Sequence, residues 1–262
     1  MQEHSFVIPA YKDSPYLESC ILSLINQTVK SEIVLCTSTP SSFIAGLAEK
    51  YGLRYCITTT PSSIATDWNF ALSQCVTPLV TIAHQDDIYH ELYTENIVRE
   101  FQRSEHMLLA FTNYEDLVNS KVRKFSLNAL VKSALLWPFW WSTSIRMPLL
   151  KKSILAFGDP ICCPTVTLNL TAISADFSFA EDYSCALDWL AWLQLAKQKG
   201  GFIYIAKKLV KHRIHPESET TNQISNGKRQ QEELQIFQMM WGEKIAKLIS
   251  KVYTVGHQDN TI

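Results

Sequence analysis

The sequence predicts an α/β fold with a mostly parallel central sheet, helices on both faces and a helical C-terminal extension. Short apolar runs alternate with amphipathic stretches from residue 5 to about residue 112, which is typical of strand–helix–strand units. Polar residues follow several of the apolar runs, at the edge where parallel sheets bind ligands. The 262 residues are enough for one large domain that carries an extension.

The first half of the chain supplies most of the predicted sheet. Ser14 and Pro15 have the residue types of an N-cap and a first helical residue. Gly52 has the type that ends a helix. Pro78 interrupts the third helix before a buried strand. The predicted strands of this half are 6–8, 33–36, 54–58, 79–83 and 107–112, and the helices between them carry residues 17–24, 43–47, 64–75 and 91–102.

The second half is less regular up to about residue 178. Apolar spacing then predicts a helix over 187–197, and two glycines separate it from a strand over 202–205. One long amphipathic helix is expected over 228–252. We therefore expect a domain over residues 1–216 and a helical extension over 217–262 that packs on the same domain.

Composition and short motifs exclude several classes of protein. A net charge of −1 provides no field that would attract nucleic acid. Neither a G-x-x-x-x-G-K-[ST] loop nor a G-x-G-x-x-G loop occurs, which disfavours kinases, NTPases and dinucleotide-dependent oxidoreductases. No signal-peptide pattern, no C-x-x-C pair and no apolar run of membrane-spanning length is present. These features predict a cytoplasmic protein with reduced cysteines.

Asp86 and Asp87 follow the predicted strand 79–83 directly. Two adjacent carboxylates repel each other unless a cation or hydrogen-bond donors compensate them. Mg²⁺ and Mn²⁺ favour one or two carboxylates together with phosphate oxygens, so this pair suits a nucleotide diphosphate. The alternative is that the pair caps the next helix, and the two roles can coexist.

Five segments, in order along residues 5 to 216, resemble family 2 glycosyltransferases of the inverting type with the GT-A fold. They are FVIPAYKDSPYLESCILSLINQT, DWNFAL, VTIAHQDD, ALDWLAWLQLAKQKGGFIYI and HRIH. The resemblance implies transfer of a sugar from a nucleotide-diphosphate donor, with a UDP-sugar favoured and Mg²⁺ or Mn²⁺ as cofactor. The acceptor would be a glycan or a lipid-linked molecule in bacterial surface polysaccharide synthesis, such as a capsule.

The resemblance also implies roles for particular residues. Asp188 would be the general base, and Asp87 and His215 would hold the metal. Glu181 and Asp182 compete as base candidates, an ordinary helix-terminal aspartate is the alternative for Asp188, and His212 competes with His215. The residues expected to bind the nucleotide-sugar are Pro9, Ala10, Tyr11, Thr37, Ser38, Asn69, Asp86 and Arg213.

Three departures from the family pattern affect the donor site. Gln85 stands where many members have another aspartate, which predicts a weaker metal site. Strand two ends in Cys-Thr-Ser-Thr instead of an aspartate, so Thr37 and Ser38 would contact the nucleotide without charge. Asp67 replaces an arginine that the family often carries, whereas Asn69 is retained.

The segment Leu130–Trp141 is rich in tryptophan, with Lys124 and Lys132 nearby. It is either an ordinary core helix or a peripheral membrane contact at the inner face of the membrane. Two other functions stay open: a nucleotidyltransferase of related fold, which would need a glycine- and arginine-rich loop after strand one, and a non-catalytic nucleotide-sugar-binding module.

Overall fold

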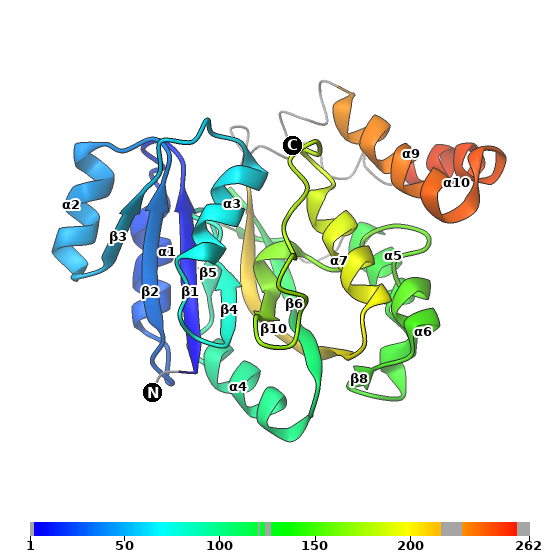
Figure 1. Cartoon of the computed structure of the whole chain (residues 1–262), viewed down its shortest axis with the longest axis horizontal. Coiled ribbons are helices and arrows are strands. Elements are labelled where there is room, and N and C mark those ends of the chain that lie inside the picture. Colours follow the sequence, from blue (N-terminus) through cyan, green and yellow to red (C-terminus); the bar gives the residue numbers. More distant parts are fainter. Residues whose placement is uncertain (1–2, 120, 124–126, 216–226, 256–262) are drawn as a thin grey trace.

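The computed structural model describes residues 3–119, 121–123, 127–215 and 227–255. A ten-stranded sheet runs through the molecule in the order β3-β2-β1-β4-β9-β6-β10-β5, with β7 beside β6 and β8 beside β10 (Figure 1). The strands are β1 His4–Ala10, β2 Glu32–Thr37, β3 Arg54–Ile57, β4 Leu79–Ile82, β5 Ile88–Tyr89, β6 Met107–Val118, β7 Lys121–Val122, β8 Ser144–Ile145, β9 Val166–Asn169 and β10 Gly201–Ile214.

Six of these strands point in the same direction. The strands β3, β2, β1 and β4 are parallel neighbours. The strand β9 is antiparallel to both β4 and β6, so β6 runs parallel to β4, and β10 pairs parallel to β6. The carboxyl ends of β1, β4, β6 and β10 therefore lie at one edge of the sheet. An antiparallel strand in the middle was not part of the predicted sheet.

Helices cover both faces of the sheet. Alternate residues of β1 face opposite sides: Phe6 and Ile8 pack with α1, α2 and α4, whereas Val7 packs with α3, α7 and α9. The helices are α1 Leu17–Ile25, α2 Ser42–Tyr51, α3 Ile64–Ser73, α4 Tyr93–Arg103, α5 Leu127–Leu135, α6 Pro148–Ser153, α7 Leu187–Lys197, α9 Lys228–Trp241 and α10 Glu243–Val255, with 3₁₀ turns η1 Trp137–Trp140 and η2 Cys163–Thr165. No helix within the described ranges is long and apolar enough to cross a membrane.

Several helix boundaries follow from local chemistry. Gly52 ends α2 in the left-handed conformation at φ 60° and donates its N–H to the carbonyls of the last turn, as predicted. The helix α1 begins at Leu17, not at Ser14 or Pro15. The Ser14 hydroxyl donates to Asp86 and accepts from the N–H of Tyr16. The single long helix expected over 228–252 is two helices, since Gly242 adopts φ 72° and breaks it.

The two C-terminal helices pack against α7. Phe237 of α9 meets Trp189 of α7 edge-to-face, with ring centroids 5.0 Å apart. The indole N–H of Trp241 donates to the carbonyl of Ala156 at 2.7 Å. Tyr253 of α10 accepts a hydrogen bond from the backbone N–H of Asp159. These contacts place α9 and α10 next to the loops that precede β9 and α7 (Figure 1).

Candidate active site

A cavity of about 900 Å³ opens at the carboxyl edge of the sheet. Its wall includes residues that follow β1 and β4 and residues at the ends of β6 and β10, because these four parallel strands end there. Helices α7, α9 and α10 supply the opposite wall. The predicted site residues Pro9, Tyr11, Asp86, Asp87, Asp188, Arg213 and His215 all line this one cavity.

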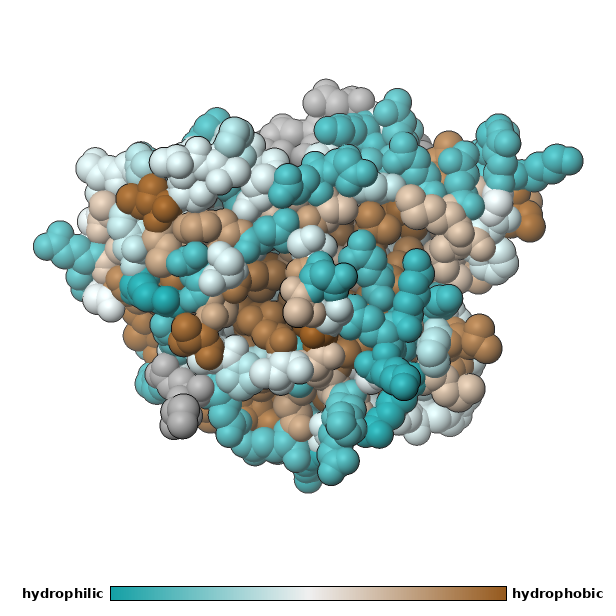
Figure 2. Space-filling view, in the orientation of Figure 1, coloured by the Kyte–Doolittle hydropathy of each residue, from teal (hydrophilic) through white to brown (hydrophobic). Residues whose placement is uncertain are grey.

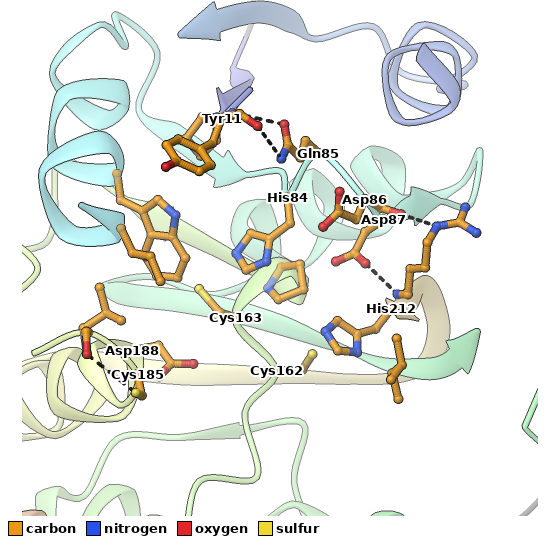
Figure 3. Close-up of a pocket in the computed structure, with 18 of the residues that line it drawn as sticks. Tyr11, His84, Gln85, Asp86, Asp87, Cys162, Cys163, Cys185, Asp188 and His212 are labelled. Atoms are coloured by element: carbon orange, nitrogen blue, oxygen red, sulfur yellow. Dashed lines mark hydrogen bonds between the residues drawn. The ribbon is translucent and has the colours of Figure 1, made fainter. Parts of the chain in front are cut away.

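The loops after β1 and β4 are joined by two backbone-to-side-chain hydrogen bonds. The N–H of Tyr11 donates to Oε1 of Gln85 at 3.1 Å, and Nε2 of Gln85 donates to the Tyr11 carbonyl at 3.2 Å (Figure 3). Gln85, which replaces an acidic residue of the family pattern, therefore fixes the Tyr11 loop beside the two aspartates. The exposed ring of Tyr11 lies at the cavity wall, where a nucleobase could stack.

Asp86 is held from three directions. Its Oδ1 accepts from the Ser14 hydroxyl at 3.0 Å, and its Oδ2 lies 3.1 Å from Nε2 of His215. Its carbonyl accepts from Nε of Arg213 at 2.9 Å. The Arg213 guanidinium lies over the Tyr16 ring, 4.3 Å from the centroid. Asp86, Arg213 and His215, which the sequence predicts to act together, thus form one connected cluster.

Asp87 is almost completely buried, with 1% of its surface exposed. One carboxylate oxygen, Oδ1, accepts from the backbone N–H of Arg213 at 2.8 Å. The other, Oδ2, is buried and has no hydrogen-bond partner among the described residues. Burial raises the pKa of Asp87 to about 6, an effect that Asp86 adds to and that His212 and Arg213 oppose. A cation would provide a partner for Oδ2, which has none among the described residues.

His212 and Arg213 lie within β10, whereas the sequence alone left open that they lie in a loop. His212 pairs in register with Asp116 of β6, and its Nδ1 is 3.7 Å from Oδ1 of that aspartate. Burial by itself lowers the pKa of His212, but the charges of Asp87 and Asp116 outweigh it and raise the pKa. The imidazolium is therefore favoured between two carboxylates. Asp116 was missed because only strand register brings it here.

The donor set suits a divalent cation that also binds a ligand. No group of three or more His, Cys, Asp or Glu side chains within the described ranges could enclose a metal. Asp87 nevertheless presents a buried, unpartnered carboxylate oxygen next to Asp86. Mg²⁺ and Mn²⁺ are bound in this way, by one or two carboxylates with phosphate oxygens and water completing the shell.

Asp188 lies in the first turn of α7, on the opposite wall from Asp87. Figure 3 shows Asp86, Asp87 and His212 on one side, Asp188 near Cys185 on the other, and His84 and Cys163 between them. Oδ1 of Asp188 accepts from the N–H of Trp189 at 2.8 Å, and burial raises the pKa of its carboxyl. Glu181 and Asp182, the competing base candidates, are exposed and lie outside the cavity wall.

Asp159 is a second carboxyl beside Asp188, and it was not among the predicted site residues. Burial and the charge of Asp188 raise the pKa of Asp159 well above the ordinary range. Arg229 of α9 and Lys132 of α5 face the same pair. Asp159 stands alone before Pro160 in an irregular stretch, and a single aspartate in such a stretch is a weak signal.

Four predicted nucleotide-sugar residues are not in the described cavity wall: Ala10, Thr37, Ser38 and Asn69. The Thr37 hydroxyl accepts from the N–H of Thr39 at 3.0 Å. Asn69 exchanges two hydrogen bonds with the backbone of Phe179, at 2.8 and 2.9 Å, and so ties α3 to the segment before α7. Lys12, which was not singled out, uses its N–H to bind the Thr39 hydroxyl.

The segment Leu130–Trp141 divides into a buried and an exposed part. Leu136, Pro138 and Phe139 are buried, whereas Trp140 and Trp141 are 65% and 75% exposed. Lys132 does not accompany the tryptophans, because its ammonium donates to the Tyr114 hydroxyl at 3.1 Å at the cavity wall. Lys124 lies outside the described residues.

Solved structures with a similar fold include two proteins in complex with nucleotide-sugars. The first 349 residues of S. aureus TarS, in complex with UDP-GlcNAc, superpose with a TM-score of 0.65 at 18% identity over 98% of this chain and 72% of that one. A Pyrobaculum calidifontis mannosyltransferase in complex with GDP-Man and Mn²⁺ has a TM-score of 0.63 at 12% identity over 98% and 70%. No curated protein matches the sequence.

The fold is therefore GT-A with a C-terminal helical extension, as the resemblance implied. The family model described as "Glycosyl transferase family 2" matches residues 5–171, which is well over half of the chain and includes the Asp86–Asp87 pair. Asp188 and the HRIH motif lie beyond the matched residues. The chain belongs to glycosyl transferase family 2.

Proposed function

We propose that this enzyme transfers a sugar, with inversion, from a nucleotide-diphosphate donor to a hydroxyl of a glycan or lipid-linked acceptor. The observation that carries the proposal is the placement of Asp86–Asp87 and Asp188 on opposite walls of one cavity. The cavity volume of about 900 Å³ is in the range of small-molecule sites and accommodates a nucleotide-sugar. Separate walls allow the diphosphate and the acceptor to approach the sugar from opposite sides.

In the proposed reaction Asp188 accepts the proton of the acceptor hydroxyl. The acceptor oxygen forms a bond to the anomeric carbon, and the bond from that carbon to the diphosphate oxygen breaks, so that the electron pair leaves with the nucleoside diphosphate. Attack from the side opposite the leaving group inverts the anomeric centre. Burial raises the pKa of Asp188, which makes its carboxylate a stronger base. A stronger base removes the hydroxyl proton more readily, and this favours general-base catalysis.

On the donor side, Asp87 would hold Mg²⁺ or Mn²⁺, with Asp86 and His215 next to it. A divalent cation supplies positive charge that neutralises the diphosphate as it leaves. Tyr11 and Pro9 would contact the nucleobase, and Arg213 would add charge near the phosphates. The structures of TarS with UDP-GlcNAc and of the mannosyltransferase with GDP-Man and Mn²⁺ support this assignment, and we favour a UDP-sugar.

We further propose a role in bacterial surface polysaccharide synthesis, in the cytoplasm at the inner face of the membrane. The exposed rings of Trp140 and Trp141 support peripheral contact, because indole groups settle at lipid–water interfaces. Leu149 of α6 and Met239 of α9 are exposed hydrophobic residues as well, and Figure 2 shows hydrophobic surface at the side of the molecule where α6 and α10 lie in Figure 1. A lipid-linked acceptor would be presented at such a surface.

One set of measurements tests the function. Nucleotide-sugars are screened for thermal stabilisation with and without Mn²⁺, and the best donor is assayed for transfer and hydrolysis. Asp87→Ala should lose the metal-dependent shift, whereas Asp188→Asn should keep it and lose ~10²- to 10⁴-fold in transfer rate. Equal donor binding without metal and in Asp87→Ala would overturn the metal assignment. Donor binding with no turnover on any acceptor would instead indicate a binding module.

A further inference from the structure

Glu232 of α9 binds the backbone at the N-terminus of α7, the helix that carries Asp188. Its Oε1 accepts from the N–H of Ser184 at 2.9 Å and from the Ser184 hydroxyl at 2.8 Å. Its Oε2 accepts from the N–H groups of Cys185 and Ala186 at 2.8 and 3.0 Å. Ala186 is the N-cap of α7, and no side chain of the helix itself caps it. One carboxylate from a separate helix therefore makes four hydrogen bonds to residues 184–186, which lead into α7.

Ionisation of Glu232 is essential to this arrangement. The first N–H groups of a helix have no intrahelical acceptor, and a negative charge there also complements the helix dipole. Burial by itself raises the pKa of Glu232, but the hydrogen bonds from Ala186, Ser184 and Cys185 outweigh burial and lower the pKa. The carboxylate form persists although only 5% of the residue is exposed.

The position of Asp188 depends on the same turn. The carboxylate of Asp188 accepts a hydrogen bond from the N–H of Trp189, the next residue in the helix. The side chain thus follows the backbone of the first turn of α7, and that backbone is anchored by Glu232 two residues upstream of Asp188. The packing of Phe237 on Trp189 attaches the same two helices at a second point.

We propose that Glu232 is a positioning residue for sugar transfer, and that it sets the placement of Asp188 at the acceptor side of the cavity by holding the N-terminal turn of α7. The inference rests on the proposed role of Asp188 as general base. It assigns the C-terminal extension a part in catalysis, since the extension supplies the group that orients the base. A displacement of ~1 Å in a catalytic group lowers rates by ~10²-fold, so this anchor matters beyond its contribution to folding.

The test compares Glu232→Gln, Glu232→Asp and a matched control. Glutamine keeps the side-chain length but offers one acceptor oxygen, so the hydrogen bonds to one of the two carboxylate oxygens are lost. Aspartate keeps both oxygens on a shorter side chain. Glu243→Gln removes an exposed carboxylate of α10 that pairs with Lys247 on the same helix face, and serves as the control. Donor titration counts the folded, binding-competent molecules of each variant.

We expect Glu232→Gln to lower kcat ~10- to 100-fold with the donor KM unchanged, because donor contacts lie on the opposite wall. Glu232→Asp should recover part of the rate, and Glu243→Gln should match the wild type. In hydrogen exchange, the amides of residues 184–186 should exchange faster in Glu232→Gln than in the control. An unchanged kcat per binding-competent molecule, or unchanged exchange at these amides, would overturn the proposal.

The pH profile separates positioning from a general loss of stability. Loss of the Glu232 charge leaves the positive helix end beside Asp188 uncompensated, which favours the ionised base. The acidic limb of kcat should therefore move to lower pH in Glu232→Gln and stay in place in Glu243→Gln. Within the described residues, the groups that interact with Asp188 include Asp159, Arg229, Lys132, Cys162 and Cys163, and all of them are retained in both variants.

The same measurements distinguish failure of this inference from failure of the proposed function. Full activity in Asp188→Asn would refute the base assignment, whatever Glu232→Gln does. An inactive Asp188→Asn together with a fully active Glu232→Gln would refute only the positioning role. Hydrogen exchange reports on the anchor even in a protein that turns over no donor, and slow exchange at residues 184–186 in Glu232→Gln would then contradict it.

Discussion

The backbone N–H of Arg213 donates to Oδ1 of Asp87 at 2.8 Å, although 126 residues separate the two in the chain. The end of β10 thereby fixes the carboxylate that follows β4 and leaves Oδ2 buried and unpartnered within the described structure. A rigid, desolvated carboxylate with one unused oxygen is poorly suited to a metal-free protein. It is well suited to a site that is completed by a cation and a diphosphate.

We expect Asp87→Asn to stabilise the metal-free protein at neutral pH. In the wild type, the pKa of Asp87 is about 6 in the folded protein, above the ordinary 3.8. The stability that the neutral carboxyl contributes is therefore present below about pH 4 and is lost as the pH rises through about 6. Ionised Asp87 then costs up to about 3 kcal/mol. Asparagine can still accept from the Arg213 N–H. Denaturant unfolding without divalent ions should show a more stable variant near pH 7.5 and equal stabilities near pH 4.

Added Mn²⁺ provides the converse measurement on the same two proteins. The ion should stabilise the wild type, whose Oδ2 it can bind, and should not stabilise Asp87→Asn. A wild type that is more stable than Asp87→Asn at both pH values without metal would show that the protein itself already compensates the carboxylate. In that case, Asp87 would have a structural role in the loop after β4 instead of a role in metal binding.

Asp159→Asn should leave transfer nearly unchanged, in contrast to Asp188→Asn. Burial raises the pKa of both carboxyls, and the charge of Asp188 raises that of Asp159 further, so Asp159 is the carboxyl that favours the neutral form. An amide has nearly the same shape as a neutral carboxyl and no charge. We expect kcat within ~3-fold of the wild type, measured between pH 6 and 9, against a ~10²- to 10⁴-fold loss in Asp188→Asn. If Asp159→Asn is the inactive variant, the proton acceptor is Asp159.

The elements that sequence reasoning located correctly are those with strong local signals. The apolar runs at 6–8, 33–36 and 79–83 are strands at the centre of the sheet, and Gly52 ends α2 as expected. The strand β9 was missed because Val166–Asn169 has only four residues and lies in an irregular stretch of the sequence. Its place between β4 and β6 is set by pairing with strands that lie far away in sequence.

The candidate site divides in the same way. Asp86 and Asp87 were found because two carboxylates directly after a buried strand are a local pattern with a physical cost. Asp116 becomes a site residue only through its register with His212, and Glu232 only through the docking of α9 on α7. No spacing in the sequence encodes such contacts, since they depend on how distant segments pack.

Gly158→Ala should displace the C-terminal extension. Gly158 adopts φ 146°, and an added Cβ would lie 2.4 Å from the Tyr253 ring of α10. Both the backbone strain and the clash destabilise the variant, by about 2 kcal/mol in thermal or chemical unfolding. Gly46→Ala is the matched control, because that position in α2 has nothing within 4 Å of the new Cβ. The control should gain about 0.5–1 kcal/mol from helix propensity.

A variant with Trp140→Ser and Trp141→Ser should bind lipid vesicles more weakly than the wild type. The two indole rings have centroids 6.0 Å apart and are largely exposed, so their loss removes apolar surface without opening the core. Each buried tryptophan contributes ~2 kcal/mol to partitioning into an apolar phase, and sedimentation with anionic vesicles at low salt measures the change. Val76→Ser, which alters an exposed apolar residue between α3 and β4, should bind as the wild type does. Wild-type protein that stays in the supernatant would remove the membrane proposal and leave the donor site unaffected.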